Sequence, residues 1–459
     1  MISKVFKAYD VRATVPEPLN EDVAWRIGNA TAQFLRTSLK GYDRSDSDIN
    51  KIVVGRDMRT HSPSLCNAFI EGAVASGTDV IDIGMIDTSQ IYFAVNHLKC
   101  CGGAQTTASH NPENYNGFKI CGLGGKPIGA ESGLKEIERI AQAISRHKVE
   151  SLECVQHIDL TEPYRDYVRK FLETPRKLKI VVDASNGMAG RWFPRIFDGV
   201  QNLEIIPINY THDGTFVHPP NPLVPENLAQ LRAKIAETGA DFGACFDGDA
   251  DRCVFVDESG EIIACDLIGC LLAREFLRDN AAATVVFDLR SSRVLREEIL
   301  AAGGVPKRQR VGHVYMKRAM KETNGIFGAE LSGHFYFRDY WACDSGMLAF
   351  IWMVNVLTRS GQTLGELIRP LRRLHSSGER NFVNDDKDGT LKMLDEKYAD
   401  GEVDHLDGVT VQYEHWWFNV RASNTEPLLR LNVEADSAEL LKEQYEKLVP
   451  LLGTLDEGH

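Results

Sequence analysis

One pattern of residues occurs three times along this chain of 459 residues, and it restricts the fold more than any other feature. In each copy an apolar strand ends in a polar turn that leads into a helix: KIVVGRDMR from residue 51, KIVVDASNG from 179 and TVVFDLRSS from 284. Each copy later reaches a Gly-Ala pair and a polar loop: GAQTTASH from 103, GACFDGDADR from 243 and GAELSGH from 328. Coincidence is an alternative, because paired valines are common in buried strands. Three matched pairs in one order favour an internal triplication of an α/β unit.

The first copy indicates what each unit contains. Residues 21–36 predict an amphipathic helix, residues 51–57 a buried strand, residues 64–76 a second helix and residues 79–84 another strand. This alternation is typical of a sheet with helices packed on it. Because such sheets bind ligands beyond the ends of their strands, we expect three similar domains to turn their polar loops toward one cleft.

The last part of the chain follows a different pattern. It contains strand-like segments at 375–383, 408–423 and 427–435, and helix-like segments at 387–398 and 437–451. These segments predict a smaller α+β domain. Since the chain is too long for one core, we expect an α/β protein of four domains, with limits at 1–152, 153–260, 261–370 and 371–459.

Charge and cysteine content exclude several classes of protein. The chain has 52 basic and 65 acidic residues, a net charge of −13, and this field repels nucleic acids and anionic membranes. An anionic substrate must therefore be bound by a local group of cations. The ten cysteines form no CxxC pair, which indicates reduced thiols rather than a zinc site or a disulfide framework. No run approaches the roughly 20 apolar residues that span a bilayer, and MISKVFKAYDVR has no signal core, so we expect a cytoplasmic protein.

Ser109 lies in the polar loop of the first copy. Asn111-Pro112 and Asn116-Gly117 favour turns, so the Ser109 hydroxyl is presented on a tight loop. Serines in turns often only satisfy backbone groups. We interpret Ser109 as a candidate nucleophile or phosphate carrier, because the second copy supplies a loop that suits a divalent cation.

That loop is DGDADR, residues 247–252. Asp247, Asp249 and Asp251 alternate, so their carboxylates can converge on one hard cation, and magnesium suits such oxygen ligands. An EF-hand is the rival interpretation, but Arg252 stands where that loop needs glycine. Three solvated aspartates without an ion are disfavoured, because like charges directly after an apolar run are costly.

Two further polar loops suit a sugar phosphate. In the third copy, Glu330, Ser332 and His334 offer acceptors and donors for sugar hydroxyls, with capping of the next helix as the alternative. The loop RASNTEP, residues 421–427, suits a phosphate dianion, with a polar hairpin tip as the alternative. Its candidate binding residues are Arg421, Ser423, Asn424 and Thr425. The local positive charge that the substrate needs is expected from Lys119, Arg252, Arg290 and His313.

With these loops the sequence resembles the α-D-phosphohexomutase superfamily, and most closely its bacterial phosphomannomutase/phosphoglucomutase branch. The resemblance covers nearly the whole chain, with six motifs in the order of the family: YDVR at 9–12, TASHNPENYNGFK at 107–119, DGDADR at 247–252, GHVYMK at 312–317, ELSGH at 330–334 and SNTEPLLRLNVEA at 423–435. It implies four domains around a central cleft. Three share a mixed α/β sheet, and the C-terminal α+β domain is a mobile lid of TATA-binding-protein-like topology.

The resemblance implies a role for each candidate. Ser109 is expected to be the phosphoserine, and the magnesium ligands to be Asp247, Asp249, Asp251 and Ser109. Glu330 and Ser332 match readers of the 3- and 4-hydroxyls of the sugar, and residues 421–425 match the loop that grips the phosphate not being transferred. The residues that match positions serving the transfer or steering the substrate are Arg12, His110, Lys119, Arg252 and His313. We take Lys119, aided by Arg12 or His110, as the candidate for proton transfer; Arg290 stands where the family often has lysine.

The implied reaction interconverts hexose 1-phosphate and hexose 6-phosphate, with mannose or glucose as the hexose. Ser109 donates and recovers a phosphoryl group, and a hexose 1,6-bisphosphate turns end for end between the two transfers. The expected partners are small sugar phosphates, and the protein is expected to be a monomer or weak dimer. A phosphoglucosamine mutase, a sugar-phosphate phosphatase and a noncatalytic sugar-phosphate sensor are the alternatives.

Overall fold

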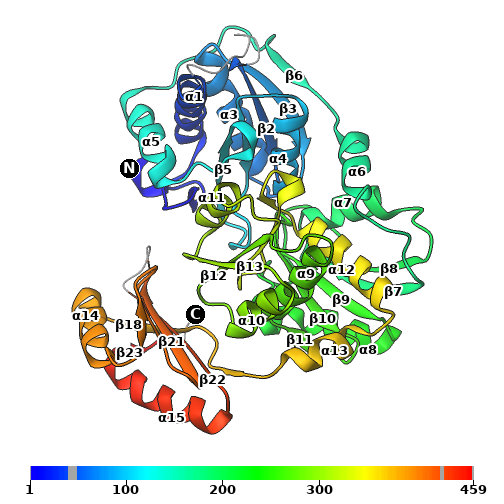
Figure 1. Cartoon of the computed structure of the whole chain (residues 1–459). Helices are drawn as coiled ribbons and strands as arrows, with labels where there is room; N and C mark the ends of the chain where they lie inside the picture. Colours follow the sequence, from blue (N-terminus) through cyan, green and yellow to red (C-terminus); the bar gives the residue numbers. More distant parts are fainter. Residues whose placement is uncertain (1, 40–48, 424–427, 457–459) are drawn as a thin grey trace.

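The computed structural model describes residues 2–39, 49–423 and 428–456. Four domains follow one another along an arc (Figure 1): the first at the top, the second at the right, the third in the centre and the fourth at the lower left. Among the described residues, none of the helices combines the length and the apolar character needed to cross a membrane.

Three sheets share one strand order, which confirms the internal triplication. Across each sheet the strands run in one spatial order: a parallel neighbour, the central strand, a second parallel neighbour, and then two strands that continue antiparallel. The last of these strands comes at the end of the second and third units, but in the first unit it precedes the central strand in the sequence. In the first sheet the strands are β3 (Asp79–Met85), β2 (Lys51–Arg56), β4 (Gly102–Thr106), β5 (Tyr115–Gly122) and β1 (Val11–Thr14), with β6 (Val155–His157) added beside β3. The second has β8 (Leu203–Ile208), β7 (Leu178–Asp183), β9 (Phe242–Phe246), β10 (Cys253–Asp257) and β11 (Ile262–Ile263). The third has β13 (Val305–Gln309), β12 (Thr284–Asp288), β14 (Phe327–Ala329), β15 (Phe335–Phe337) and β16 (Cys343–Asp344).

The helices of these units cover the sheets. The first unit has α1 (Glu21–Thr37), α3 (Ser62–Ala75), α4 (Thr88–His97) and α5 (Leu134–Ala143), and the second has α6 (Thr161–Arg169), α7 (Met188–Phe197) and α8 (Ala229–Thr238). The third has α9 (Cys265–Arg278), α10 (Arg293–Ala301), α11 (His313–Glu322), α12 (Gly346–Ser360) and α13 (Leu364–Ile368). Helix α12 joins the third domain to the second, because its Phe350 ring lies 4.9 Å from that of Phe193.

The same turn follows the central strand in each unit. Asp57, Asp183 and Asp288 are fully buried, and each accepts a hydrogen bond from the backbone N–H two residues further on. This Asx turn redirects the chain at the end of the strand. The triplication therefore extends to an aspartate that is the last residue of β7 and β12 and the first residue after β2.

The fourth domain is a separate unit with an antiparallel sheet. Its strands run in the order β19 (Glu402–Asp404), β20 (Val409–Gln412), β21 (Trp416–Ala422), β22 (Leu428–Ala435), β18 (Arg380–Val383) and β23 (Thr454–Leu455), while β17 (His375–Ser376) also pairs with β22. Helices α14 (Lys387–Lys397) and α15 (Ala438–Leu448) complete it. Its apolar residues, among them Phe382, Val411 and Leu431, form a core of their own, which makes it a domain distinct from the other three.

Candidate active site

Loops from the first and second domains meet at Ser109. The loop after β4 carries Ser109, and the loop after β9, the equivalent strand of the second unit, carries Asp247. The Ser109 hydroxyl donates a hydrogen bond of 2.6 Å to Oδ2 of Asp247. The backbones also touch, because a Cβ on Gly248 would lie 2.5 Å from the carbonyl oxygen of Ser109. The serine and the aspartate loop therefore form one site.

Ser109 has a constrained backbone. Its φ of +52° lies in the left-handed region, which for a residue other than glycine costs on the order of 1–3 kcal/mol. The Thr107 hydroxyl accepts a hydrogen bond from the Ser109 N–H at 3.0 Å. The residue is 1% exposed, so the surrounding structure holds the hydroxyl in one place.

Arg59, which is not among the residues predicted from the sequence, holds the loop of Ser109 from inside the first domain. Its guanidinium donates to the backbone carbonyls of Ser109 at 2.9 Å, Asn111 at 2.6 Å, Pro112 at 2.6 Å and Tyr115 at 3.1 Å. It is 1% exposed. A signal existed, because the D-x-R sequence that ends the first unit's central strand occurs again in the third unit as Asp288 to Arg290.

The three aspartates converge as predicted. One carboxylate oxygen from each of Asp247, Asp249 and Asp251 can be chosen so that all three lie within 4.8 Å of one another. The carboxylates are buried, and within the described part of the chain the Oδ1 atoms of Asp249 and Asp251 accept no hydrogen bond. Buried acceptors without donors suit a hard cation, so these residues fit a divalent metal ion.

The buried charges shift the pKa values of the Asp247 and Asp249 carboxyls in opposite directions. Burial, together with Asp249 and Asp251, raises the pKa of Asp247 to about 8. Burial acts in the same direction on Asp249, but Lys119 outweighs it and lowers the pKa of that carboxyl. The Lys119 ammonium lies 2.7 Å from Asp249 and also contacts Asp251. These neighbours outweigh burial and raise the pKa of Lys119, which is therefore charged at neutral pH.

Further basic residues predicted from the sequence surround the serine. The Arg12 guanidinium donates to Asn111 Oδ1 at 2.7 Å, and Arg252 Nε lies 3.8 Å from Asp247. Nδ1 of His110 lies 3.4 Å from the Ser109 hydroxyl oxygen. Burial, with Arg252 and Arg12, lowers the pKa of His110 far below its usual value, so the imidazole is neutral. A neutral ring next to the hydroxyl is able to accept a proton.

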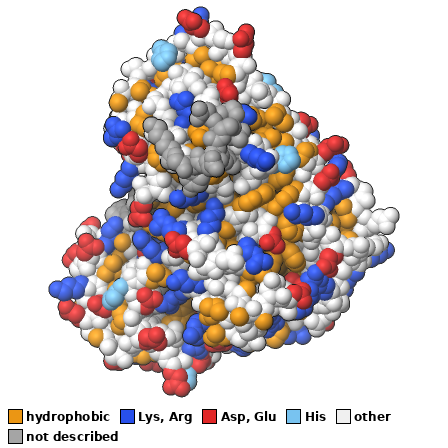
Figure 2. Space-filling view, turned by 45° about the horizontal axis from the view of Figure 1, so that its top comes forward, with side chains coloured by type: hydrophobic (Ala, Val, Ile, Leu, Met, Phe, Trp, Pro, Cys, Tyr) orange, Lys and Arg blue, Asp and Glu red, His pale blue; other side chains and the backbone are white. Residues whose placement is uncertain are grey.

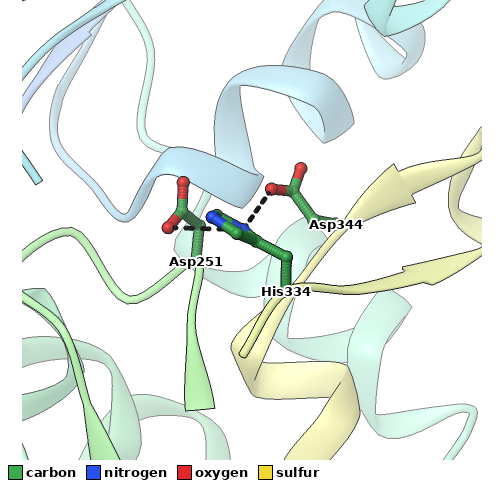
Figure 3. Close-up of side chains that lie close together, drawn as sticks. All are labelled: Asp251, His334 and Asp344. Atoms are coloured by element: carbon green, nitrogen blue, oxygen red, sulfur yellow. Dashed lines mark ion pairs between the residues drawn. The ribbon is translucent and has the colours of Figure 1, made fainter. Parts of the chain in front are cut away.

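His334 connects the loop of the three aspartates, residues 247–252, to the loop at residues 328–334, which we call the sugar loop. Its ring lies between Asp251 and Asp344 (Figure 3), with Nδ1 at 3.8 Å from the first carboxylate and 2.9 Å from the second. Its Nε2 accepts a hydrogen bond from Arg252 Nε at 3.1 Å. Asp251, His334 and Asp344 could also hold a metal ion, but Lys317 already lies 2.7 Å from Asp344. The all-oxygen group of aspartates is the better magnesium site.

The sugar loop lies against the loop that precedes α11. Glu330 is 1% exposed and accepts hydrogen bonds from the Gly312 N–H at 3.0 Å and from the Tyr336 hydroxyl. The Leu331 N–H donates to Asp288 at 2.9 Å, and Ser332 is half-buried in the turn that follows. The His313 ring lies 6.4 Å from that of His334. Tyr336 orients Glu330, a role that only the folded structure reveals.

The candidate phosphate grip lies where the third and fourth domains meet. Arg290 and Arg421 both contact Glu379, at 3.5 Å and 2.9 Å. Ser423 is buried on the same segment as Arg421, and Asn424 and Thr425 fall outside the described residues. Lys and Arg side chains gather along the hollow between the upper and the lower left parts of the molecule (Figure 2). This surface gives an acidic protein the local positive charge needed to bind an anion.

A buried serine beside three convergent carboxylates and several cations defines an enzyme of the phosphoryl-transfer class. Four sequence models of the phosphoglucomutase/phosphomannomutase family match the chain. Its alpha/beta/alpha domains I, II and III match residues 3–148, 162–260 and 265–374, and its C-terminal domain matches residues 381–451. The chain belongs to this family, and it is an isomerase of the phosphohexomutase type.

Individual relatives are similar to this chain over nearly its full length. A phosphomannomutase of Salmonella montevideo is 38% identical, over 98% of this chain and 99% of its own. A protein of Xanthomonas campestris pv. campestris named "Phosphohexose mutases" is 37% identical, over 98% of this chain and 100% of its own. A crystal structure of a phosphoglucomutase/phosphomannomutase family protein from Burkholderia thailandensis superposes with a TM-score of 0.87, at 32% identity, and covers 97% of this chain and 96% of its own.

Proposed function

We propose that this enzyme interconverts hexose 1-phosphate and hexose 6-phosphate, with mannose or glucose as the hexose, through a phosphoserine at Ser109. The observation that carries this proposal is the 2.6 Å contact between Ser109 and Asp247. It supports a phosphoryl group on the serine next to a cation held by the aspartates. Relatives named phosphomannomutase support the choice of hexose.

We assign Mg²⁺ to Asp247, Asp249 and Asp251, with a phosphate oxygen on Ser109 as a further ligand. When bound, this ion supplies positive charge that neutralises the transferring phosphoryl group. Arg12, Lys119 and Arg252 add fixed cations around the same group. Phosphoryl transfer depends mainly on position and charge stabilisation, and the chain supplies both.

In the forward step the bond between phosphorus and the Ser109 oxygen breaks, and a bond from phosphorus to the sugar oxygen forms. A base takes the proton of the sugar hydroxyl, and the Ser109 oxygen, which leaves as an alkoxide, takes up a proton to restore the serine hydroxyl. Lys119 is the base expected from the sequence, and we propose His110 as a second candidate. The neutral His110 ring can accept a proton directly. Lys119 is charged beside Asp249 and Asp251, so it acts as a base only if it first loses its proton. General base catalysis typically contributes about 10²- to 10⁴-fold.

The other end of the substrate requires a separate grip. We propose that Arg421 and Arg290 bind the phosphate that is not transferred, with Ser423, Asn424 and Thr425 on the same loop. Glu330, Ser332 and His334 would read the sugar hydroxyls. A hexose 1,6-bisphosphate that turns end for end exchanges its two phosphates between this grip and Ser109.

The test is the fate of mannose 1-phosphate and glucose 1-phosphate, followed by ³¹P NMR with Mg²⁺ and a trace of hexose 1,6-bisphosphate. We expect conversion to the 6-phosphates without inorganic phosphate, and no conversion by Ser109→Ala. Release of inorganic phosphate would support a phosphatase, and binding without turnover a sensor. Preferential conversion of glucosamine 1-phosphate would support a phosphoglucosamine mutase instead.

Several expectations from the sequence stay predictions. These are the domain limits at 1–152, 153–260, 261–370 and 371–459, a monomeric or weakly dimeric state, and a cytoplasmic location. Light scattering over a range of protein concentrations measures the oligomeric state, and limited proteolysis between the proposed domains tests their limits.

A further inference from the structure

Glu379 lies among three arginines at the junction of the third and fourth domains. It precedes β18, and its Oε2 is 2.9 Å from Arg421 and 3.5 Å from Arg290. Its Oε1 is 3.5 Å from Arg430. One carboxylate oxygen is thus shared by a cation of the third domain and a cation of the fourth, while the second oxygen faces another cation of the fourth.

This arrangement has the geometry of a bound anion. Guanidinium groups bind carboxylates and phosphates with the same N–H donors, so a site that holds one can hold the other. The side chains of Arg290 and Arg421 are 9% and 6% exposed, whereas that of Glu379 is 24% exposed. The cations are therefore fixed in the protein, and the anion lies nearer to solvent.

Glu379 leaves at least one N–H donor of the arginine cluster without an acceptor. In the described residues, the buried Nε of Arg421 has no hydrogen-bond partner. A buried donor without an acceptor is unfavourable by roughly 1–3 kcal/mol. A phosphate dianion carries more charge and more acceptor oxygens than one carboxylate, so it satisfies this cluster more completely.

We propose that Glu379 is an internal substitute for the phosphate of the substrate. In the unliganded enzyme its carboxylate occupies the arginine grip and links the third domain to the fourth, and the phosphate that is not transferred displaces it. The inference rests on the proposed function only in naming that phosphate as the natural ligand. Any phosphate dianion that reaches the grip competes with the same carboxylate.

The charge state of Glu379 agrees with this role. Burial opposes its ionisation, but Arg290, Arg421 and Arg430 outweigh burial and lower the pKa of Glu379 to about 2. The carboxylate is therefore an anion throughout the neutral range. Because it must leave before phosphate binds, the apparent affinity for phosphate is lower than the arginines alone would give.

The experiment measures inorganic phosphate binding to the full-length protein by titration calorimetry, for the wild type and Glu379→Gln. Glutamine keeps the shape of the side chain and removes the charge that competes. We expect Glu379→Gln to bind phosphate on the order of tenfold more tightly, and to lower the KM for hexose 1-phosphate in the same direction. The matched control is Glu446→Gln, which removes one exposed carboxylate from α15 of the same domain and should leave phosphate affinity unchanged.

A weaker or an unchanged phosphate affinity in Glu379→Gln overturns the proposal. A weaker affinity would mean that Glu379 helps the arginines to bind phosphate, and an unchanged affinity would mean that its charge does not compete with phosphate. If Glu379→Gln does not fold, a crystal structure of the wild type with inorganic phosphate decides: the carboxylate must have left Arg421. The calorimetry does not depend on turnover. A wild type without mutase activity would reject the proposed function, while tighter phosphate binding by the variant would still support this inference.

Discussion

The hydroxyl oxygen of Ser109 lies 2.6 Å from Oδ2 of Asp247, although 138 residues separate them in the chain. They meet because each follows an equivalent strand, β4 in the first sheet and β9 in the second. Glu330 follows β14, the third member of the set. Repetition of one α/β unit thus places the candidate nucleophile, the candidate metal ligands and the candidate sugar-binding residues at corresponding strand ends.

Removing one carboxylate should weaken metal binding. We expect Asp249→Asn to lower Mg²⁺ affinity by at least about 100-fold, because second-sphere changes alone cost 10- to 100-fold and this residue is a proposed ligand. Chelator-treated protein is titrated with Mg²⁺ and, in parallel, with Mn²⁺. Asp213→Asn is the control, because that carboxylate lies on an exposed loop and accepts hydrogen bonds from its neighbour Thr215. Equal Mg²⁺ affinities in the wild type and in Asp249→Asn would contradict the assignment of the metal site to these aspartates.

Changing Arg59 should reduce kcat with little effect on substrate binding, because Arg59 acts on the backbone of the Ser109 loop. We expect Arg59→Lys to lower kcat by on the order of 100-fold, since a displacement of about 1 Å at a reacting group costs that much. Lysine keeps the charge but cannot reach four carbonyls as the guanidinium does. Steady-state kinetics should show a fall in kcat with little change in KM. Arg146→Lys changes an exposed ion pair with Glu71 and should have no effect. A change confined to KM would contradict a role in positioning Ser109.

Removing the Tyr336 hydroxyl should disturb the sugar loop. In Tyr336→Phe, Glu330 loses a buried donor, and hydrogen bonds to charged groups contribute about 1.5–3 kcal/mol. We expect the free energy of unfolding to fall by about that amount and the KM for hexose 1-phosphate to rise. Chemical denaturation and kinetics measure the two effects. Tyr413→Phe, which removes a hydroxyl bonded to exposed Asp400 in the fourth domain, should change neither strongly. An unaltered KM would show that Glu330 needs no orientation by Tyr336.

Asp266 should make stability depend on pH. Burial raises its pKa to about 6, above the value of about 3.9 expected in the unfolded chain. A carboxyl whose folded pKa is raised contributes stability below the unfolded pKa, and this contribution is lost as pH rises through the folded pKa. We therefore expect Asp266→Asn to gain stability relative to wild type between about pH 4 and 6, and to keep a constant difference above that range. Unfolding in denaturant at several pH values measures this difference. A difference that stays level from pH 4 to 8 would contradict the shift.

The fold was accessible from the sequence because its signals are local and repeated. Strand periodicity, the Gly-Ala pairs and the polar turns each lie within a few residues, and three copies reinforce one another. Helix α1 begins at Glu21 and ends at Thr37, against a prediction of 21–36. The fourth domain was distinguished in the same way, by a change in the order of strands and helices.

The contacts that complete the site could not be predicted from the sequence, because they join segments far apart in the chain. Glu379 lies in the segment 375–383, which the sequence predicts only as a strand, and folding brings it to Arg290 and Arg421. Arg59 belongs to a motif that predicts the end of a strand, yet its four carbonyl partners lie 50 to 56 residues away in the chain. Long-range pairing of buried polar groups leaves no local pattern to read.

The most direct test of the account is peptide mass spectrometry of Ser109 after the wild-type protein has been mixed with hexose 1,6-bisphosphate. We predict one phosphoryl group on Ser109, which disappears when hexose 1-phosphate is added and returns as the bisphosphate is consumed. A Ser109 that never carries phosphate while the enzyme turns over, or phosphate found only on another residue, would contradict it.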